Sequence, residues 1–329
     1  MKTFIQRYYI FFLYIPILVV SFLLFSQNIY KGIFLLLVFT IWFLLSLINR
    51  KEYLYTILLI LFVLPLNITL QLNGISDPYV GGFFVNYLVP TLSVLDVCIS
   101  ILFVQLTILH TDIFKRVITD KYLLIFFVLL AIHNIFVHNF LTIQLSLRLS
   151  VYLLTSILLL NVLLKDRKVL RNAYIKIPIN IQILFQGCLG IYQFIKGSSL
   201  GLSFLGESNI VNGMLGSSFI DIQGVSYLRA YGTFPHPNVL AGWYILMFFT
   251  SIFLYRKSKD KIYIVNIFLI LLFIVFTFSR VSIILLSISF FTLLFKYFLK
   301  TKKMYSLSSI LWYRFLNIFS GEDSSIEDR

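Results

Sequence analysis

The chain has 329 residues, of which 60% are hydrophobic and only 12% carry a charge. Soluble domains average about 25% charged residues, so this composition excludes an ordinary soluble fold. The formal net charge of +14 comes from Lys and Arg residues that stand between apolar runs. This pattern is explained by the orientation of the chain in a membrane and by attraction to anionic membrane lipids. Binding to nucleic acid is therefore not expected.

Apolar runs follow one another along the chain, and each has about the 20 residues that one helical membrane crossing needs. They predict about ten transmembrane helices, at residues 8–25, 32–48, 53–71, 91–109, 122–138, 145–164, 173–195, 237–255, 262–278 and 281–299. The sequence therefore predicts an all-α polytopic membrane protein. Residues 1–299 are expected to form the transmembrane helical domain, and residues 300–329 a basic segment followed by an acidic tail.

Basic residues are dense in every second connection between the predicted spans. When the N-terminus is placed inside, the dense groups at 50–51, 115–121, 165–171, 256–261 and 300–303 fall on one side. The other side keeps only Lys31, Arg148, Lys196, Arg229 and Arg280. By the positive-inside rule, the N-terminus and the dense groups are expected in the cytoplasm.

Two connections on the external side are long, at about residues 72–90 and 196–235. The second is rich in Gly and Ser and contains Glu207, Asp221 and Arg229. Long loops carried by a rigid scaffold concentrate function, so the second loop is the first place to look for a site.

Arginines near the external surface are the first candidates for that site. Arg280 stands at a tight junction between two apolar runs, and Arg229 approaches the same face from the long loop. An arginine costs about 2.5–3.5 kcal/mol at the centre of a membrane helix and less toward the interface, so its presence asks for a reason. For Arg280 we favour anion binding over snorkelling to lipid phosphates. Arg148 is a third candidate, for which snorkelling is the favoured interpretation.

The residues before the eighth predicted span add to this site. Pro237 suits the first turn of a helix, because its missing N–H needs no partner there. That helix would begin at the external interface, with free N–H groups and the positive end of its dipole pointing outward. His236 either caps the helix or acts as acid, base or phosphate ligand near neutral pH. Together these features predict an anionic ligand at the outer boundary, such as a lipid-linked pyrophosphate.

Polar residues inside the spans leave alternatives open. Gln182, Gln186 and Gln193 line one helical face of the seventh span, which favours helix packing over a substrate groove. Asp96 in the fourth span is the feature that supports a proton-coupled transporter. The two cysteines lie inside apolar runs without metal-ligand spacing, so no metal or other cofactor is expected.

Two motifs in a fixed order carry a family resemblance: "RAYGTFPHPN" at residues 229–238, followed by "VLAGWY", and then "FTFSR" ending at Arg280. They resemble the O-antigen ligase and polysaccharide polymerase superfamily. "GIYQF" at residues 190–194 is similar to the family's seventh-span pattern, and the tail "RFLNIFSGEDSSIEDR" looks like its approach to a large periplasmic loop. The resemblance covers roughly residues 90–329.

The resemblance implies a multi-pass glycosyltransferase of the bacterial inner membrane with a GT-C-like helical bundle, which acts in lipopolysaccharide or other cell-envelope polysaccharide synthesis. It would transfer a glycan from undecaprenyl pyrophosphate to lipid A core or a polysaccharide acceptor on the external face, without metal or nucleotide. Arg229 and Arg280 would hold the pyrophosphate as catalytic residues. The expected substrate-binding residues are His236, Asn238, Arg148 and Gln193.

One functional residue of the family is not found by this resemblance, and two alternative functions remain open. In the family, a histidine of the large periplasmic loop is thought to activate the acceptor hydroxyl, and no counterpart of that histidine is expected in this sequence. Residues 300–329 are therefore expected to be the start of the loop region, and no general base is assigned. The alternatives are a transporter or flippase of polysaccharide precursors, and a non-catalytic membrane scaffold or truncated remnant.

Overall fold

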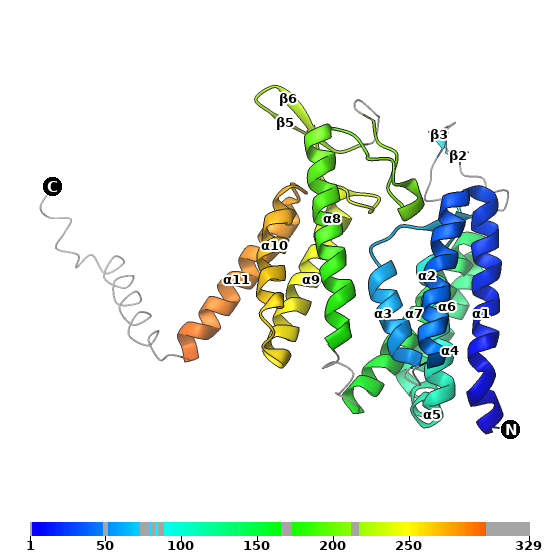
Figure 1. The fold of residues 1–329 in the computed structure, drawn as a ribbon. Helices are drawn as coiled ribbons and strands as arrows, with labels where there is room; N and C mark the ends of the chain where they lie inside the picture. Colours follow the sequence, from blue (N-terminus) through cyan, green and yellow to red (C-terminus); the bar gives the residue numbers. More distant parts are fainter. Residues whose placement is uncertain are drawn as a thin grey trace, which may run out of the picture. The chain divides into compact units, whose positions relative to one another are not determined.

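A computed structural model gives the fold, and it describes residues 2–48, 52–72, 79–80, 83–84, 89–137, 139–165, 173–211 and 217–300. The described part of the chain is mostly helical (Figure 1). Its α-helices are α1 (Lys2–Gln27), α2 (Ile29–Ile48), α3 (Glu52–Val63), α4 (Val94–Leu109), α5 (Thr111–Ile118), α6 (Lys121–Val137), α7 (Phe140–Lys165), α8 (Lys176–Lys196), α9 (Pro237–Ser258), α10 (Ile262–Val275) and α11 (Arg280–Lys300). The predictions for residues 301–329 lie outside the described residues.

Short strands and 3-10 turns fill the connections. The strands are β1 (Thr69–Gln71), β2 (Tyr79–Val80), β3 (Phe83–Phe84), β4 (Thr91–Ser93), β5 (Phe219–Ile222) and β6 (Val225–Leu228), and the 3-10 turns are η3 (Ala173–Ile175) and η4 (Ser203–Leu205). In the described residues the strands form three antiparallel pairs, β1 with β4, β2 with β3, and β5 with β6. The chain divides into two compact units, Met1–Phe278 and Ser279–Arg329, and α11 belongs to the second.

Four helices of the described chain are long and apolar enough to cross a membrane, at Ile10–Gln27, Ile29–Leu47, Phe140–Lys165 and Pro237–Ser258. The pair α4 and α5, bent by 107°, would make a fifth if it counts as one span. Further apolar helices are shorter, at Tyr53–Val63, Lys121–Val137, Ile262–Val275 and Arg280–Ser289. The fold therefore agrees with the predicted all-α membrane class at the level of four to five candidate spans. The ten crossings stay a prediction.

The predicted span at 53–71 is too long. Helix α3 ends at Val63, and a turn at Leu64–Pro65 follows it. Pro65 has no N–H to donate to the preceding turn, which favours the end of the helix at this point. The chain then enters β1, where Leu70 pairs with Leu92 of β4. The apolar run thus covers a helix, a turn and a strand.

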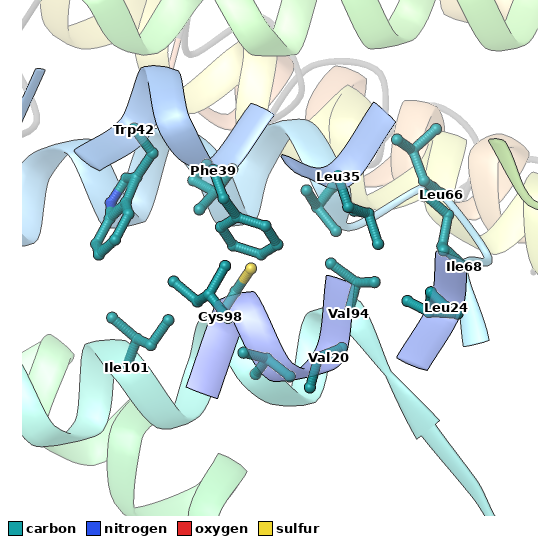
Figure 2. Close-up of a cluster of buried hydrophobic side chains, with 14 of the residues drawn as sticks. Val20, Leu24, Leu35, Phe39, Trp42, Leu66, Ile68, Val94, Cys98 and Ile101 are labelled. Carbon is teal, nitrogen blue, oxygen red and sulfur yellow. The ribbon is translucent and has the colours of Figure 1, made fainter. Parts of the chain in front are cut away.

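The largest apolar core joins α1, α2, α3 and α4. Figure 2 shows α2 side chains facing those of α4, among them Leu35, Phe39, Trp42, Val94, Cys98 and Ile101. Cys98 is fully buried, in keeping with its interpretation as a small apolar residue. The Trp42 indole N–H donates to Thr56 Oγ1 at 3.1 Å. Because lipid tails are as apolar as these side chains, close packing and such hydrogen bonds hold the helices together.

Helix α8 packs against α3, α9 and α10 and orients the segment that holds the candidate site. Gly187 allows α10 to come close, since a Cβ there would stand 2.2 Å from the Phe273 ring. At the start of α8, Lys176 Nζ pairs with Asp260 Oδ2 at 2.8 Å, in the connection between α9 and α10. This contact holds the pKa of the Asp260 carboxyl below its usual value, chiefly through the hydrogen bond from Lys176.

Candidate functional site

The segment at 229–236 runs from the end of β6 to the start of α9. The β5–β6 hairpin turns at Gln223 and Gly224, with φ of 52° and 81°, the left-handed conformation that two-residue hairpin turns require. Backbone bonds then fix the segment on two sides. Arg229 N donates to Ser218 O at 3.1 Å, and Ala230 N donates to Phe276 O at 2.9 Å, just after α10. The segment is therefore held between the hairpin and the C-terminal end of α10.

Helix α9 begins with Pro237, as predicted, and His236 is its N-cap. The prediction of free N–H groups there is wrong, because Asn238 N bonds to His236 Nδ1 and Val239 N bonds to His236 O at 3.0 Å. The His236 backbone is extended, and its Nδ1 accepts a hydrogen bond from Asn238 N at 3.1 Å. Its Nε2 lies 3.2 Å from Ser218 Oγ. Because Nδ1 accepts, a neutral imidazole carries its proton on Nε2 and donates it to Ser218. The structure thus supports the capping interpretation of His236.

Arg229 is half-buried, and its guanidinium is fixed beside the start of α9. Nε donates to Thr277 O at 2.7 Å, and Nη2 donates to Asn238 Oδ1 at 2.8 Å. Asn238 in turn donates its backbone N–H to His236, so the structure brings these three predicted site residues together. Burial first, and then the positive charge of Arg229, lower the pKa of His236. The imidazole is therefore held in its neutral form more strongly than in solution.

Arg280 is the first residue of α11 and is exposed. It belongs to the second unit, where Ile283 N donates to Ser279 O at 3.1 Å in the first turn of the helix. In the sequence it follows Thr277, the residue that anchors Arg229, by three positions. The contacts that define the candidate site are therefore those of Arg229, His236 and Asn238.

Gln193 holds the site segment from the side of α8. Its Oε1 accepts from the N–H groups of Tyr231 at 3.0 Å and Gly232 at 2.8 Å. Its Nε2 donates to Gly232 O and to Glu207 Oε1, both at 2.9 Å. These four bonds use the whole capacity of the amide. Substrate binding by Gln193 stays a prediction, and the role that its contacts support is to position the loop.

The other two glutamines of α8 also bond within the protein. Gln186 exchanges hydrogen bonds with Thr233, from Thr233 N at 2.9 Å and to Thr233 Oγ1 at 2.8 Å. Gln182 donates to the carbonyl of Phe62 in α3. Gly232 has φ of 60°, and a Cβ there would stand 2.3 Å from Gln186 Oε1, so this close approach needs glycine. The contacts agree with the packing interpretation of the glutamine stripe.

Glu207 is a buried carboxylate of the long loop for which the sequence predicts no role. Its carboxylate accepts hydrogen bonds from Leu200 N at 2.7 Å and Leu202 N at 2.6 Å, and another from the side-chain amide of Gln193. It thereby ties the first part of the long loop to the end of α8. Its residue type gives no signal of this role, because its partners are two backbone groups and a side chain on a preceding helix.

Arg148 and Asp96 form a second polar cluster. Arg148 lies two turns inside α7, and the predicted span began too late to place it correctly. Its Nη2 contacts Asp96 Oδ2 at 2.8 Å and the carbonyl of Thr91. Tyr152 Oη donates to Asp96 Oδ1 at 2.7 Å. The bonds of Arg148 therefore lead to α4 and β4, and its role in substrate binding stays a prediction.

Asp96 also occupies the first turn of α4 and is not deep inside it. Ser93 Oγ accepts from Asp96 N at 3.0 Å, and Ser93 N donates to Asp96 Oδ2 at 2.7 Å, which together form a capping box. The carboxylate therefore caps a helix and pairs with a cation at once.

In the described part of the chain, no three His, Cys, Asp or Glu side chains are grouped so that they could hold a metal ion. Comparison with models of protein families, with curated proteins and with solved structures finds no match to the chain. The candidate site is thus defined by its own geometry, a fixed arginine and a capped helix N-terminus in one segment.

Proposed function

We propose that the chain is a membrane glycosyltransferase of the O-antigen ligase or polymerase kind, with about ten crossings and a GT-C-like bundle. It transfers a glycan from undecaprenyl pyrophosphate to lipid A core or a polysaccharide acceptor on the external face of the bacterial inner membrane. The observation that supports this most is the guanidinium of Arg229, held by Thr277 and Asn238 beside the N-terminus of α9.

This arrangement suits a pyrophosphate leaving group. In the transfer, the bond from the sugar's anomeric carbon to the pyrophosphate breaks, and a bond to the acceptor oxygen forms. The hydroxyl proton of the acceptor goes to a base. Negative charge develops on the departing pyrophosphate, and a pre-oriented guanidinium beside the positive end of a helix stabilises it without reorganisation. Arg280, three positions after Thr277 in sequence, is the second cation in the proposal.

His236 has a narrower role than acid–base chemistry. Its Nδ1 is occupied by Asn238 N, and its Nε2 proton faces Ser218, so the neutral ring has no lone pair left to accept a proton. We assign it to fixing the start of α9, and we assign no general base.

Helix α8 supports the external placement of this site. The Lys176–Asp260 pair lies at the start of α8. Gln193, which bonds to the backbone of the site segment, stands 17 residues after Lys176 in the same helix. At the α-helical rise these positions are about 25 Å apart, close to the thickness of a bilayer core. The basic connection 256–261 adjoins the first end, so Arg229 belongs on the opposite side.

The transporter alternative depends on Asp96 as a proton carrier. The carboxylate caps α4 and bonds to Arg148 and Tyr152, which accounts for its presence as a stabilising pair. Glycan transfer is therefore the function that we propose.

Binding of undecaprenyl pyrophosphate to the chain in lipid nanodiscs tests the proposal. We expect Arg229→Lys and Arg280→Lys each to weaken binding by about tenfold or more, because lysine lacks the bidentate fork. Lys196→Gln, which removes an exposed cation at the end of α8, is the matched control and should bind normally. Normal binding by both lysine variants would overturn the proposal.

A further inference from the structure

An apolar pocket of about 540 Å³ lies between α2, α3 and the start of α8. Trp42, Leu59 and Pro178 form its buried floor. Its rim includes Ile41, Ile177 and Ile181, whose side chains are 57%, 49% and 47% exposed. The volume lies in the range of about 300–1,000 Å³ that is usual for pockets that enclose small ligands.

The pocket is built into the helix packing. Helix α3 packs against both α2 and α8, and so holds the two walls in place with the floor between them. The exposed rim residues lie on helices whose outer surfaces are apolar. In a membrane protein, the molecules that meet such surfaces are lipid acyl chains.

Charge points to the class of lipid. The pocket is lined by the second half of α2 and the first two turns of α8. By sequence, the connection after α2 contains Arg50 and Lys51, and the one before η3 contains Arg167, Lys168 and Arg171, directly after Lys165 at the end of α7. Basic clusters beside a membrane attract anionic headgroups by about 1 kcal/mol per residue. By the positive-inside rule, this side faces the cytoplasmic leaflet, which holds anionic lipids.

We propose that the pocket binds an acyl chain of an anionic phospholipid from the cytoplasmic leaflet. This lipid site is distinct from the Arg229 segment, which α8 carries at its other end. It goes beyond the proposed function and stands independently of glycan transfer, so either proposal can fail without the other.

Trp42 provides the probe, since it lies on the pocket floor. The full chain, with Trp243→Phe and Trp312→Phe, retains Trp42 as its only tryptophan. It is reconstituted in phosphatidylcholine vesicles that contain a small fraction of phosphatidylglycerol, with bromine on the acyl chains of one lipid or the other. We expect brominated phosphatidylglycerol to quench Trp42 severalfold more, at equal mole fraction, than brominated phosphatidylcholine.

A matched pair of variants isolates the pocket. Val38 lines it, while the neighbouring Leu37 does not and is 60% exposed. Val38→Phe should fill the pocket and abolish the preference for phosphatidylglycerol, and Leu37→Phe should keep it. The elution volume in size-exclusion chromatography checks that both variants fold.

Equal quenching by the two lipids, or an unchanged preference in Val38→Phe, would overturn the proposal. Protection of Trp42 from both lipids, together with cross-linking between copies at Ile177→Cys, would assign the pocket to a second copy of the chain and also overturn it.

Discussion

The imidazole of His236 stabilises the start of α9 only while its Nδ1 carries no proton. Burial and the charge of Arg229 lower its pKa in the folded protein. The unfolded chain therefore binds a proton more readily than the folded chain does in mildly acidic solution. The stabilising contribution is complete above the unfolded pKa of about 6.5. It is lost as the pH falls from there toward the lower folded-state pKa.

We therefore predict that the backbone amide of Asn238 becomes less protected from hydrogen exchange as the pH falls below about 6.5. His236→Asn retains a good N-cap that does not titrate, so its protection at Asn238 should not show this step. His133→Asn, at an exposed position on α6, is the control and should behave as the parent chain does. Exchange at Asn238 is corrected for the intrinsic pH dependence. A step that persists in His236→Asn would contradict the assignment.

At the level of single elements, a salt bridge between Arg148 and Asp96 joins α7 to α4. The side chain of Asp96 is 11% exposed and that of Arg148 is 26% exposed, and their atoms are 2.8 Å apart. Removing one partner of such a pair leaves an uncompensated charge, which is far more costly than removing both.

Arg148→Gln should therefore destabilise the protein by about 3–5 kcal/mol, and addition of Asp96→Asn should recover part of that loss. The free energy of unfolding is measured in detergent micelles. Asp260→Asn, which breaks the more exposed pair with Lys176, is the control and should have little effect. If Arg148→Gln is as mild as this control, the Asp96–Arg148 pair does not anchor α7.

The helices illustrate how far the sequence can be interpreted. Apolar length predicts α1, α2, α9 and α11 closely, and Pro237 predicts where α9 begins, because these signals are local. Amphipathic α5 was missed because only part of its surface is apolar: Ile113, Phe114 and Val117 pack on a core while its charged residues face away. Apolar length also fails after α3, where Pro65 ends the helix inside an apolar run.

The grouping of the candidate site residues follows only in part from local signals in the sequence. Arg229, His236 and Asn238 stand within ten residues, so their proximity follows from the sequence. The contacts of Gln193 join residues 14 and 39 positions apart, and those of Arg148 reach 52 and 57 positions away. Such pairings depend on how helices pack, which periodicity in one sequence does not specify.

On the scale of the whole protein, the proposed mechanism depends on sidedness. The β5–β6 hairpin adjoins the end of α8 that carries Gln193, whereas the connection after α9 bonds to its beginning (Figure 1). Helix α9 joins these two levels and is long and apolar enough to cross a membrane. The two connections must therefore face opposite compartments if α9 crosses, and the positive-inside rule predicts that the one after α9 faces the cytoplasm.

Single cysteines should report this topology. In a background with Cys98→Ala and Cys188→Ala, Val225→Cys lies on the exposed hairpin and Lys257→Cys at the exposed end of α9. We expect a membrane-impermeant maleimide to label Val225→Cys in intact spheroplasts, and Lys257→Cys only after permeabilisation. The reverse pattern would place Arg229 in the cytoplasm, away from any acceptor on the external face, and would end the glycan-transfer proposal. Labelling of both in intact spheroplasts would show that α9 does not cross, so the spacing along α8 would no longer measure a bilayer.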